Sequence, residues 1–172
     1  MHNENELIQA VARGEEYALE ILFERHYEGI WKYALVILKN PEDAKEVVND
    51  TFFRAFRYAG QFRGDGLFSA WLYRIAKNLC MNILNRRKKL LKAVSVVGDE
   101  MRKYNNSSAP DIAPFIEKLD NLKADYRDVI ILKDISGYSM KEMAGIMGRS
   151  VPAIKTLHHR AINKLREINC FQ

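Results

Sequence analysis

Residues 149–166 carry the side chains of this sequence that are best suited to contact nucleic acid. They include Arg, Lys, Thr and Asn, and no acidic residue. Apolar residues at helical spacing predict a buried stripe along this segment and just beyond it, made of Val151, Ile154, Leu157, Ala161, Leu165 and Ile168. The outward face then presents Pro152, Ala153, Lys155, Thr156, His159, Arg160 and Asn163. Because phosphates attract cations and base edges pair with such polar side chains, the pattern favours a DNA-binding helix over a merely solvated one.

The residues just before this helix predict a shorter helix and a tight turn. Ser139 and Glu142 form a capping-box pattern that starts the shorter helix. Gly148 supplies the left-handed residue that ends it, Ser150 can cap the next helix, and Pro152 falls where a missing N–H costs nothing. Since both sides of the turn carry a cap, the segment predicts a helix-turn-helix, and the alternative is an ordinary helical hairpin with a solvated basic face.

The rest of the chain also shows helical periodicity, and no stretch alternates as a strand would. Gly14 ends a first short helix, and Asn40 and Pro41 mark the boundary between two later ones. The predicted helices of the first half span residues 4–12, 15–39, 41–59 and 67–91. Residues 93–111 lose all periodicity, and two further helices precede the helix-turn-helix. We therefore expect an all-α protein with two small helical domains, residues 1–92 and 112–172, joined by a flexible linker over 93–111.

The predicted helix over 41–59 has one apolar face and one mixed face. The apolar face comprises Ala44, Val47, Val48, Thr51, Phe52 and Ala55. The mixed face comprises Glu46, Asn49, Asp50, Phe53 and Arg57. Phe53 lies off the apolar stripe, and an exposed aromatic side chain among carboxylates is typical of a partner surface. From these residues alone, a solvated acidic face is an equal alternative.

A glycine-punctuated loop over residues 60–68 and the helix after it combine aromatic rings, amides and arginines. Phe62, Arg63 and Phe68 offer what an unstacked base needs for stacking and hydrogen bonding, although many such loops are simple turns. One face of the following helix carries Trp71, Arg74, Asn78, Asn82, Asn85 and Arg86. This line of side chains indicates a nucleic-acid track more than a solvated surface.

Composition limits the classes of function. The chain has 172 residues, 48% of them hydrophobic and 28% charged, and its net charge of +5 gathers in residues 85–92 and in the last helix. Cys80 and Cys170 have no Cys or His at metal-ligand spacing, and the adjacent His158 and His159 diverge on a helix, so we expect no metal site. No phosphate loop, nucleophile elbow or supported carboxylate pair occurs, so we expect no catalytic residue, no cofactor and no enzyme.

Three segments carry a resemblance to a known family. They are Asp-Ala-Lys-Glu-Val-Val-Asn-Asp-Thr-Phe-Phe-Arg at 43–54, Phe-Arg-Gly-Asp at 62–65 with Trp-Leu-Tyr-Arg-Ile-Ala-Lys-Asn at 71–78, and Tyr-Arg-Asp-Val-Ile-Ile-Leu at 126–132. In this order, and followed by the helix-turn-helix, they make nearly the whole chain resemble the extracytoplasmic-function (ECF) sigma factors of bacterial RNA polymerase.

The resemblance implies three binding surfaces. Core RNA polymerase would contact Asp43, Glu46, Val47, Asn49, Asp50 and Phe53. The minus-ten promoter element would contact Phe62, Arg63, Gly64, Asp65, Phe68, Trp71, Arg74, Asn78, Asn82 and Arg86. The minus-thirty-five element would contact Arg149, Ser150, Pro152, Ala153, Lys155, Thr156, His159 and Arg160.

The same resemblance implies the biological setting. The partners would be core RNA polymerase, promoter DNA and an anti-sigma factor, and the target a stress or envelope-signal regulon. No apolar run approaches membrane-spanning length and the acidic amino terminus lacks signal-peptide features, so we expect a cytoplasmic protein without direct membrane insertion, held at the membrane only through an anti-sigma factor. The alternative is a stand-alone helix-turn-helix regulator, which would have no use for the Phe53 face or the Arg63 loop.

Overall fold

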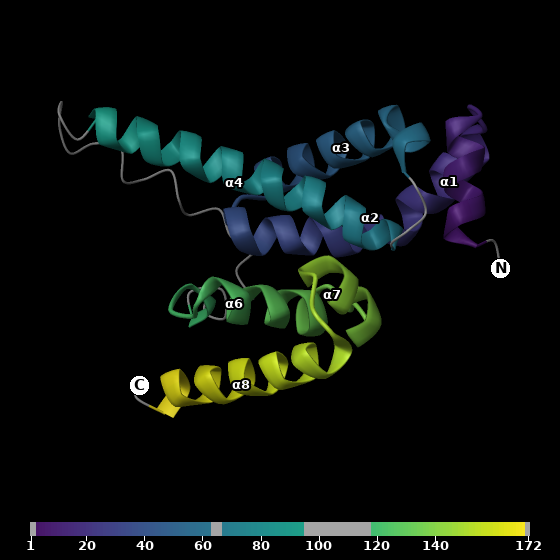
Figure 1. Ribbon diagram of the computed structural model, residues 1–172. Coiled ribbons are helices and arrows are strands. Elements are labelled where there is room, and N and C mark those ends of the chain that lie inside the picture. The colour runs from purple at the N-terminus through teal and green to yellow at the C-terminus, as the bar shows by residue number, and fades with distance from the viewer. Residues whose placement is uncertain (1–2, 63–66, 95–117, 171–172) are drawn as a thin grey trace.

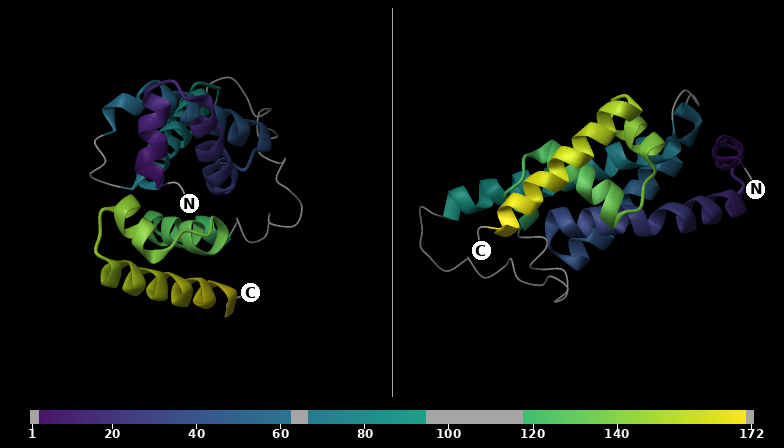
Figure 2. Two further views of the ribbon diagram at one scale, coloured as in Figure 1. Left: turned by 90° about the vertical axis from the view of Figure 1, so that its right-hand side faces the viewer. Right: turned by 90° about the horizontal axis from the view of Figure 1, so that it is seen from below.

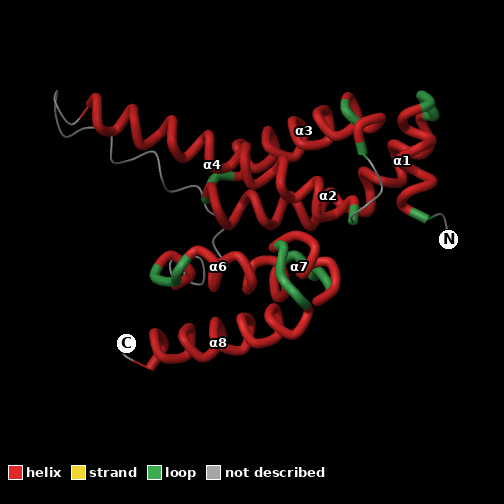
Figure 3. Tube along the Cα trace, viewed as in Figure 1, coloured by secondary structure: helices red, strands yellow, loops and turns green. Residues whose placement is uncertain are grey.

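The computed structural model describes residues 3–62, 67–94 and 118–170, and the elements in this part of the chain are helical, as Figures 1 and 3 show. They are α1 (Glu4–Ala12), α2 (Glu16–Leu38), α3 (Pro41–Arg57), the 3-10 turn η1 (Ala59–Gln61), α4 (Phe68–Val94), α6 (Ala124–Ile130), the π-helical turn η3 (Ile131–Ile135), α7 (Met140–Met147) and α8 (Val151–Cys170). The prediction of an all-α protein is confirmed.

The N-terminal unit packs α2, α3 and α4 alongside one another, with α1 across the end where α2 begins (Figure 1). Its boundaries follow from local caps. The Asn40 side chain accepts a hydrogen bond from the Asp43 N–H at 3.0 Å, and Pro41 occupies the first turn of α3. Apolar stripes then meet in one core, which includes Leu22, Ile30, Ala34, Val48, Phe52, Leu72 and Ala76.

The C-terminal unit contains the predicted helix-turn-helix. The Ser139 hydroxyl accepts from the Glu142 N–H at 3.2 Å, while the Glu142 carboxylate accepts from the Ser139 N–H at 2.8 Å. Gly148 ends α7 with a φ of 63°, a left-handed conformation that residues other than glycine rarely adopt. The Ser150 hydroxyl then accepts from the Ala153 N–H at 3.3 Å and starts α8. The capped turn predicted from the sequence is confirmed.

The two units pack against each other through α7 on α4 and η3 on α2, while α8 lies on the far side of α6 and α7 (Figures 1 and 2). Small residues permit this approach. A methyl group on Gly29 would lie 3.2 Å from the Tyr138 hydroxyl, which is a tight approach, and one on Gly145 would make an ordinary contact of 3.4 Å with Leu67. Lys77 Nζ of α4 also lies 2.6 Å from the carboxylate of Asp128 in α6. We call this contact region the interdomain interface.

Helix boundaries differ from the predictions by a few residues. Helix α3 ends at Arg57, two residues before the 3-10 turn begins at Ala59, and α4 continues to Val94, so it includes the first two residues of the predicted linker. Residues 95–111 of that linker lie outside the described residues. The sequence did not predict the π-helical turn, in which the Ser136 N–H donates to the Ile131 carbonyl at 2.8 Å.

Candidate nucleic-acid interface

The predicted recognition face of α8 is open to solvent. Its exposed side chains are Pro152, Ala153, Lys155, Thr156, His159, Arg160 and Asn163, and Arg149 and Ser150 of the turn are exposed as well. On the opposite side, Ile154, Ala161 and Leu165 are buried against α6 and α7. The face therefore combines cations, a hydroxyl and an amide on a helix that stands clear of the N-terminal unit, a geometry suited to a major groove.

Several polar side chains of the helix-turn-helix have partners inside the unit. His159 and Asn163 form a hydrogen bond of 3.2 Å along the outward face. His158 turns the other way and lies 2.8 Å from the Asp134 carboxylate, so the two adjacent histidines diverge as expected. Arg149 lies 2.5 Å from the Asp125 carboxylate of α6, an ion pair that holds the turn. Among the residues that the structure describes, no three His, Cys, Asp or Glu side chains lie close enough together to hold a metal ion.

Three aromatic rings form a cluster where the 60–68 loop meets α4. Phe62 lies 5.5 Å from Trp71 and 6.0 Å from Phe68 between ring centroids. Phe62 and Trp71 are half-buried, but Phe68 is 2% exposed and contacts the His26 ring at 5.5 Å. The predicted base contact by Phe68 is therefore corrected: its ring fills the core and supports the other two. Arg63, Gly64 and Asp65 lie outside the described residues.

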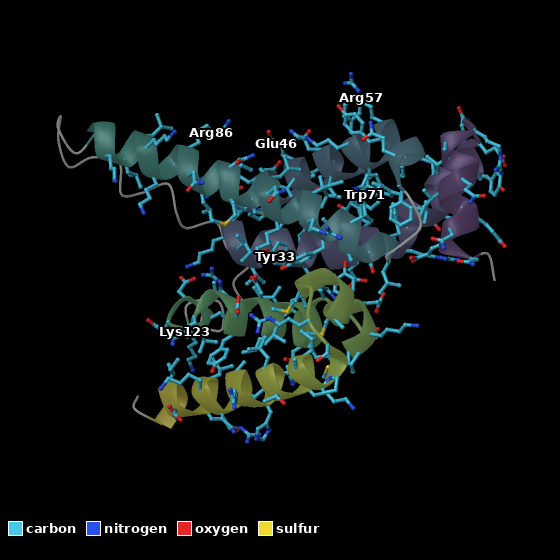
Figure 4. The ribbon with its side chains drawn as sticks, viewed as in Figure 1. Tyr33, Glu46, Arg57, Trp71, Arg86 and Lys123 are labelled. Atoms are coloured by element: carbon cyan, nitrogen blue, oxygen red, sulfur yellow. The ribbon has the colours of Figure 1, made fainter. Side chains whose placement is uncertain are left out.

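A line of polar side chains runs along α4 beyond this cluster. Arg74, Asn78, Asn82, Asn85 and Arg86 are all exposed, and the labels of Trp71 and Arg86 in Figure 4 mark the two ends of the line. Arg74, the arginine of this line that is nearest the aromatic cluster, lies in a cleft of about 220 Å³ between the two units. Arg149 also lines this cleft. Side chains expected to contact separate promoter elements thus approach each other at the interdomain interface.

The outward face of α3 has the exposure expected of a partner surface. Phe53 is 63% exposed, Glu46 and Asn49 are exposed, and Asp50 is half-buried (Figure 4 labels Glu46). Val47 is 1% exposed, so its predicted polymerase contact is corrected: the helical period directs this side chain into the core.

Arg87 is a residue whose role the sequence reasoning missed. It forms an ion pair with Asp43 and donates to the Leu38 carbonyl at 3.1 Å, so it ties α4 to the end of α2 and the start of α3. Asp43 is thereby held within the unit. The signal was the helical phase, because Arg87 follows Ile83 by four residues and buried Cys80 by seven, and so lies on the inward side of α4.

Burial makes several titratable groups inert. It raises the pKa of the Cys80 thiol to about 12, so this free cysteine stays protonated near neutral pH. Burial also raises the pKa of Tyr33 and of Tyr73, whose rings lie 4.5 Å apart, and the nearby Asp128 carboxylate adds to the effect. These groups belong to the packing of the units and not to a reactive site.

The fold joins an aromatic cluster and a polar track to a helix-turn-helix, a combination suited to a protein that binds both unpaired bases and duplex DNA. Residues 22–90 match the family Sigma-70 region 2, and residues 112–165 match Sigma-70, region 4. The ECF RNA polymerase sigma factor SigM of Mycobacterium tuberculosis is 30% identical over 167 residues, which cover 95% of this chain and 83% of SigM. The chain therefore belongs to the ECF RNA polymerase sigma factors.

Solved structures agree with this assignment. The structure of CnrH in complex with the cytosolic domain of CnrY matches with a TM-score of 0.75 and 28% identity, over 98% of each chain. RpoE of Bartonella quintana, in complex with the anti-sigma factor NepR, matches with a TM-score of 0.64 and 26% identity, over 87% of this chain and 94% of RpoE. As an RNA polymerase sigma factor, the protein binds core RNA polymerase and promoter DNA and directs promoter-specific initiation. In the part of the chain that the structure describes, no helix is long and apolar enough to cross a membrane.

Proposed function

We propose that this sigma factor divides its work between the two predicted domains. Domain 1–92 binds core polymerase through the outward face of α3 and captures unpaired minus-ten bases beside Phe62 and Trp71. Domain 112–172 reads the minus-thirty-five element with α8, and residues 93–111 link the two. The observation that carries this proposal is the exposed, wholly non-acidic outward face of α8 on a capped helix-turn-helix.

The proposed contact residues follow from exposure as well as from position. Core polymerase contacts Glu46, Asn49, Asp50 and Phe53, with Asp43 held by Arg87 as part of the support. Minus-ten DNA contacts Phe62, Trp71, Arg74, Asn78, Asn82 and Arg86, together with the 63–65 segment. Minus-thirty-five DNA contacts Ser150, Pro152, Ala153, Lys155, Thr156, His159 and Arg160, with Arg149 positioning the turn.

An anti-sigma factor is the proposed inhibitory partner. RpoE, one of the structural relatives above, was solved in complex with the anti-sigma factor NepR, and CnrH was solved in complex with the cytosolic domain of CnrY. By analogy, such a protein holds this factor inactive in the cytoplasm, where RNA polymerase works, until a stress or envelope signal releases it.

Run-off transcription with purified core polymerase tests the function. A randomised promoter library should yield transcripts with core plus this protein and none with either alone. A stand-alone regulator would instead bind a duplex promoter fragment tightly without core and leave the transcript pattern of core polymerase unchanged. That second outcome would overturn the proposal.

A further inference from the structure

The end of α4 extends beyond the bundle against which the rest of this helix packs (Figure 1). The bundle ends at Arg87, which pairs with Asp43 at the start of α3 and donates to the carbonyl of Leu38 at the end of α2. Leu90 and Leu91 follow, and they are 58% and 51% exposed. We call residues 88–92 the α4 overhang.

The two leucines of the overhang continue the inward stripe of α4. Leu90 follows Ile83 by seven residues, and Leu91 follows Leu84 by seven. Residues at this spacing lie on the same side of a helix, and both Ile83 and Leu84 pack against the core. The leucines therefore form an apolar face that lacks the cover which α2 and α3 give to the stripe before Arg87.

The other side of the overhang is basic. Lys88, Lys89 and Lys92 are exposed, and residues 85–92 include no acidic side chain. A helix with one basic and one apolar side is typical of segments that lie on an anionic membrane surface. On such a surface the lysine ammonium groups reach the headgroups, while the apolar side chains enter the boundary between headgroups and acyl chains.

We propose that the α4 overhang binds the surface of an anionic phospholipid bilayer, with Leu90 and Leu91 in the interface and the three lysines at the headgroups. A bilayer matches both sides of the overhang, because it presents negative charge and apolar surface in one plane. Duplex DNA would neutralise the lysines but would leave the leucines in water. The overhang lies on the bilayer and does not cross it, and this contact is separate from the promoter contacts proposed above.

Flotation of the full chain with phospholipid vesicles tests the inference. Vesicles of equal parts phosphatidylglycerol and phosphatidylcholine should bind the chain, and vesicles of phosphatidylcholine alone should not. Lys88→Gln with Lys89→Gln should lower the partition coefficient about 25-fold, because each lysine near an anionic surface contributes about fivefold. Leu90→Gln with Leu91→Gln should lower it about tenfold or more, because the new amides disfavour the interface. Glutamine is a good helix former, and circular dichroism checks that α4 is retained.

Two matched controls make the result specific. Lys123→Gln with Lys141→Gln removes the same charge from exposed positions outside the overhang, and Met81→Gln changes a 44% exposed side chain that lies seven residues before Lys88, on the basic side of α4. Both should weaken binding much less than their counterparts in the overhang. Equal loss for the two lysine pairs would show only the general attraction of a basic protein, and wild-type binding by the leucine variant would show attraction by charge alone. Either result overturns the inference, as does a wild-type chain that does not bind the anionic vesicles.

Discussion

The two regions proposed to bind DNA differ in the kind of side chain they present. The N-terminal region places half-buried rings, Phe62 and Trp71, beside an amide and arginine track. The outward face of α8 has no Phe, Tyr or Trp and relies on cations, Thr156 and Asn163. An unpaired base offers its face, whereas a base pair in a duplex offers only its edges. The difference supports the proposal that the N-terminal region binds melted DNA and that α8 binds the double-stranded part of the same promoter.

The regions differ in support as well. The rings of the N-terminal region pack on a core that contains Phe68 and His26, so their position depends on the whole unit. The recognition face of α8 depends on local caps, on the Arg149–Asp125 ion pair and on contacts with α6 and α7. Substitutions can therefore separate polymerase binding, melting and duplex reading from one another.

The largest effect is expected from the α3 surface. Asp50→Arg with Phe53→Ala should abolish association with core polymerase, because it reverses a charge and removes a 63% exposed ring at the predicted contact. Co-purification with core measures the result. Arg160→Ala on α8 is the matched control and should co-purify normally. Retained association of the double variant would show that the polymerase contact lies elsewhere.

Promoter melting should distinguish the ring cluster from α8. Phe62→Ala or Trp71→Ala removes a stacking surface worth roughly 1–3 kcal/mol per base, so permanganate footprints of the promoter complex should lose reactivity in the minus-ten element. Circular dichroism checks that the variants fold. Lys155→Ala should melt a promoter normally once the complex is formed. Full melting by both ring variants would assign the rings to packing alone.

Duplex reading should depend on particular positions of α8. Arg160→Ala should cost about 1–3 kcal/mol at one base-pair position if its contact is bidentate to guanine. Transcription of a library with every base of the upstream element varied measures this preference. A uniform loss of activity with unchanged base preference would make Arg160 a phosphate contact instead.

The interdomain interface should open when its ion pair is broken. The Asp128 side chain is 6% exposed, and Lys77→Met removes the ammonium group that pairs with its carboxylate. Since Lys77 itself is 43% exposed, we expect a destabilisation of about 1–2 kcal/mol, less than for a fully buried pair. Small-angle scattering should report a larger radius of gyration. Lys141→Met, on the exposed surface of α7, is the control, and equal radii for both variants would contradict the prediction.

The smallest effect is expected at the end of α8. Lys164→Ala should weaken binding to all promoters alike. It should also reduce the slope of the logarithm of the binding constant against the logarithm of salt concentration by about one. Lys164 already pairs with Glu167 at 2.7 Å, so its loss should matter less than Arg166→Ala. Salt titrations of holoenzyme binding compare the two. A change in base preference for Lys164→Ala would place this lysine among the reading residues.

Much of the fold and of the recognition face was predictable because local rules determine them. Caps at Asn40, Ser139 and Gly148 set helix ends, and the apolar period of α8 determined which side chains face outward. Phe68 and Arg87 were not predicted because their roles depend on which helices meet in three dimensions. A residue's phase shows that it points inward, but it does not identify the partner that Arg87 finds in Asp43.

The glycines of the interdomain interface constrain how this protein can evolve. Gly145 admits Leu67 and Ala70, and Gly29 admits Tyr138, so each unit is shaped to the other. A methyl group on Gly145 would already make ordinary contact with Leu67, so a chimera of residues 1–94 with the helix-turn-helix unit of a paralogue should pack poorly if that paralogue has a side chain larger than alanine at position 145. Sigma factors of this type that acquire a new promoter specificity by exchanging the helix-turn-helix unit should therefore keep a small residue at the position equivalent to 145.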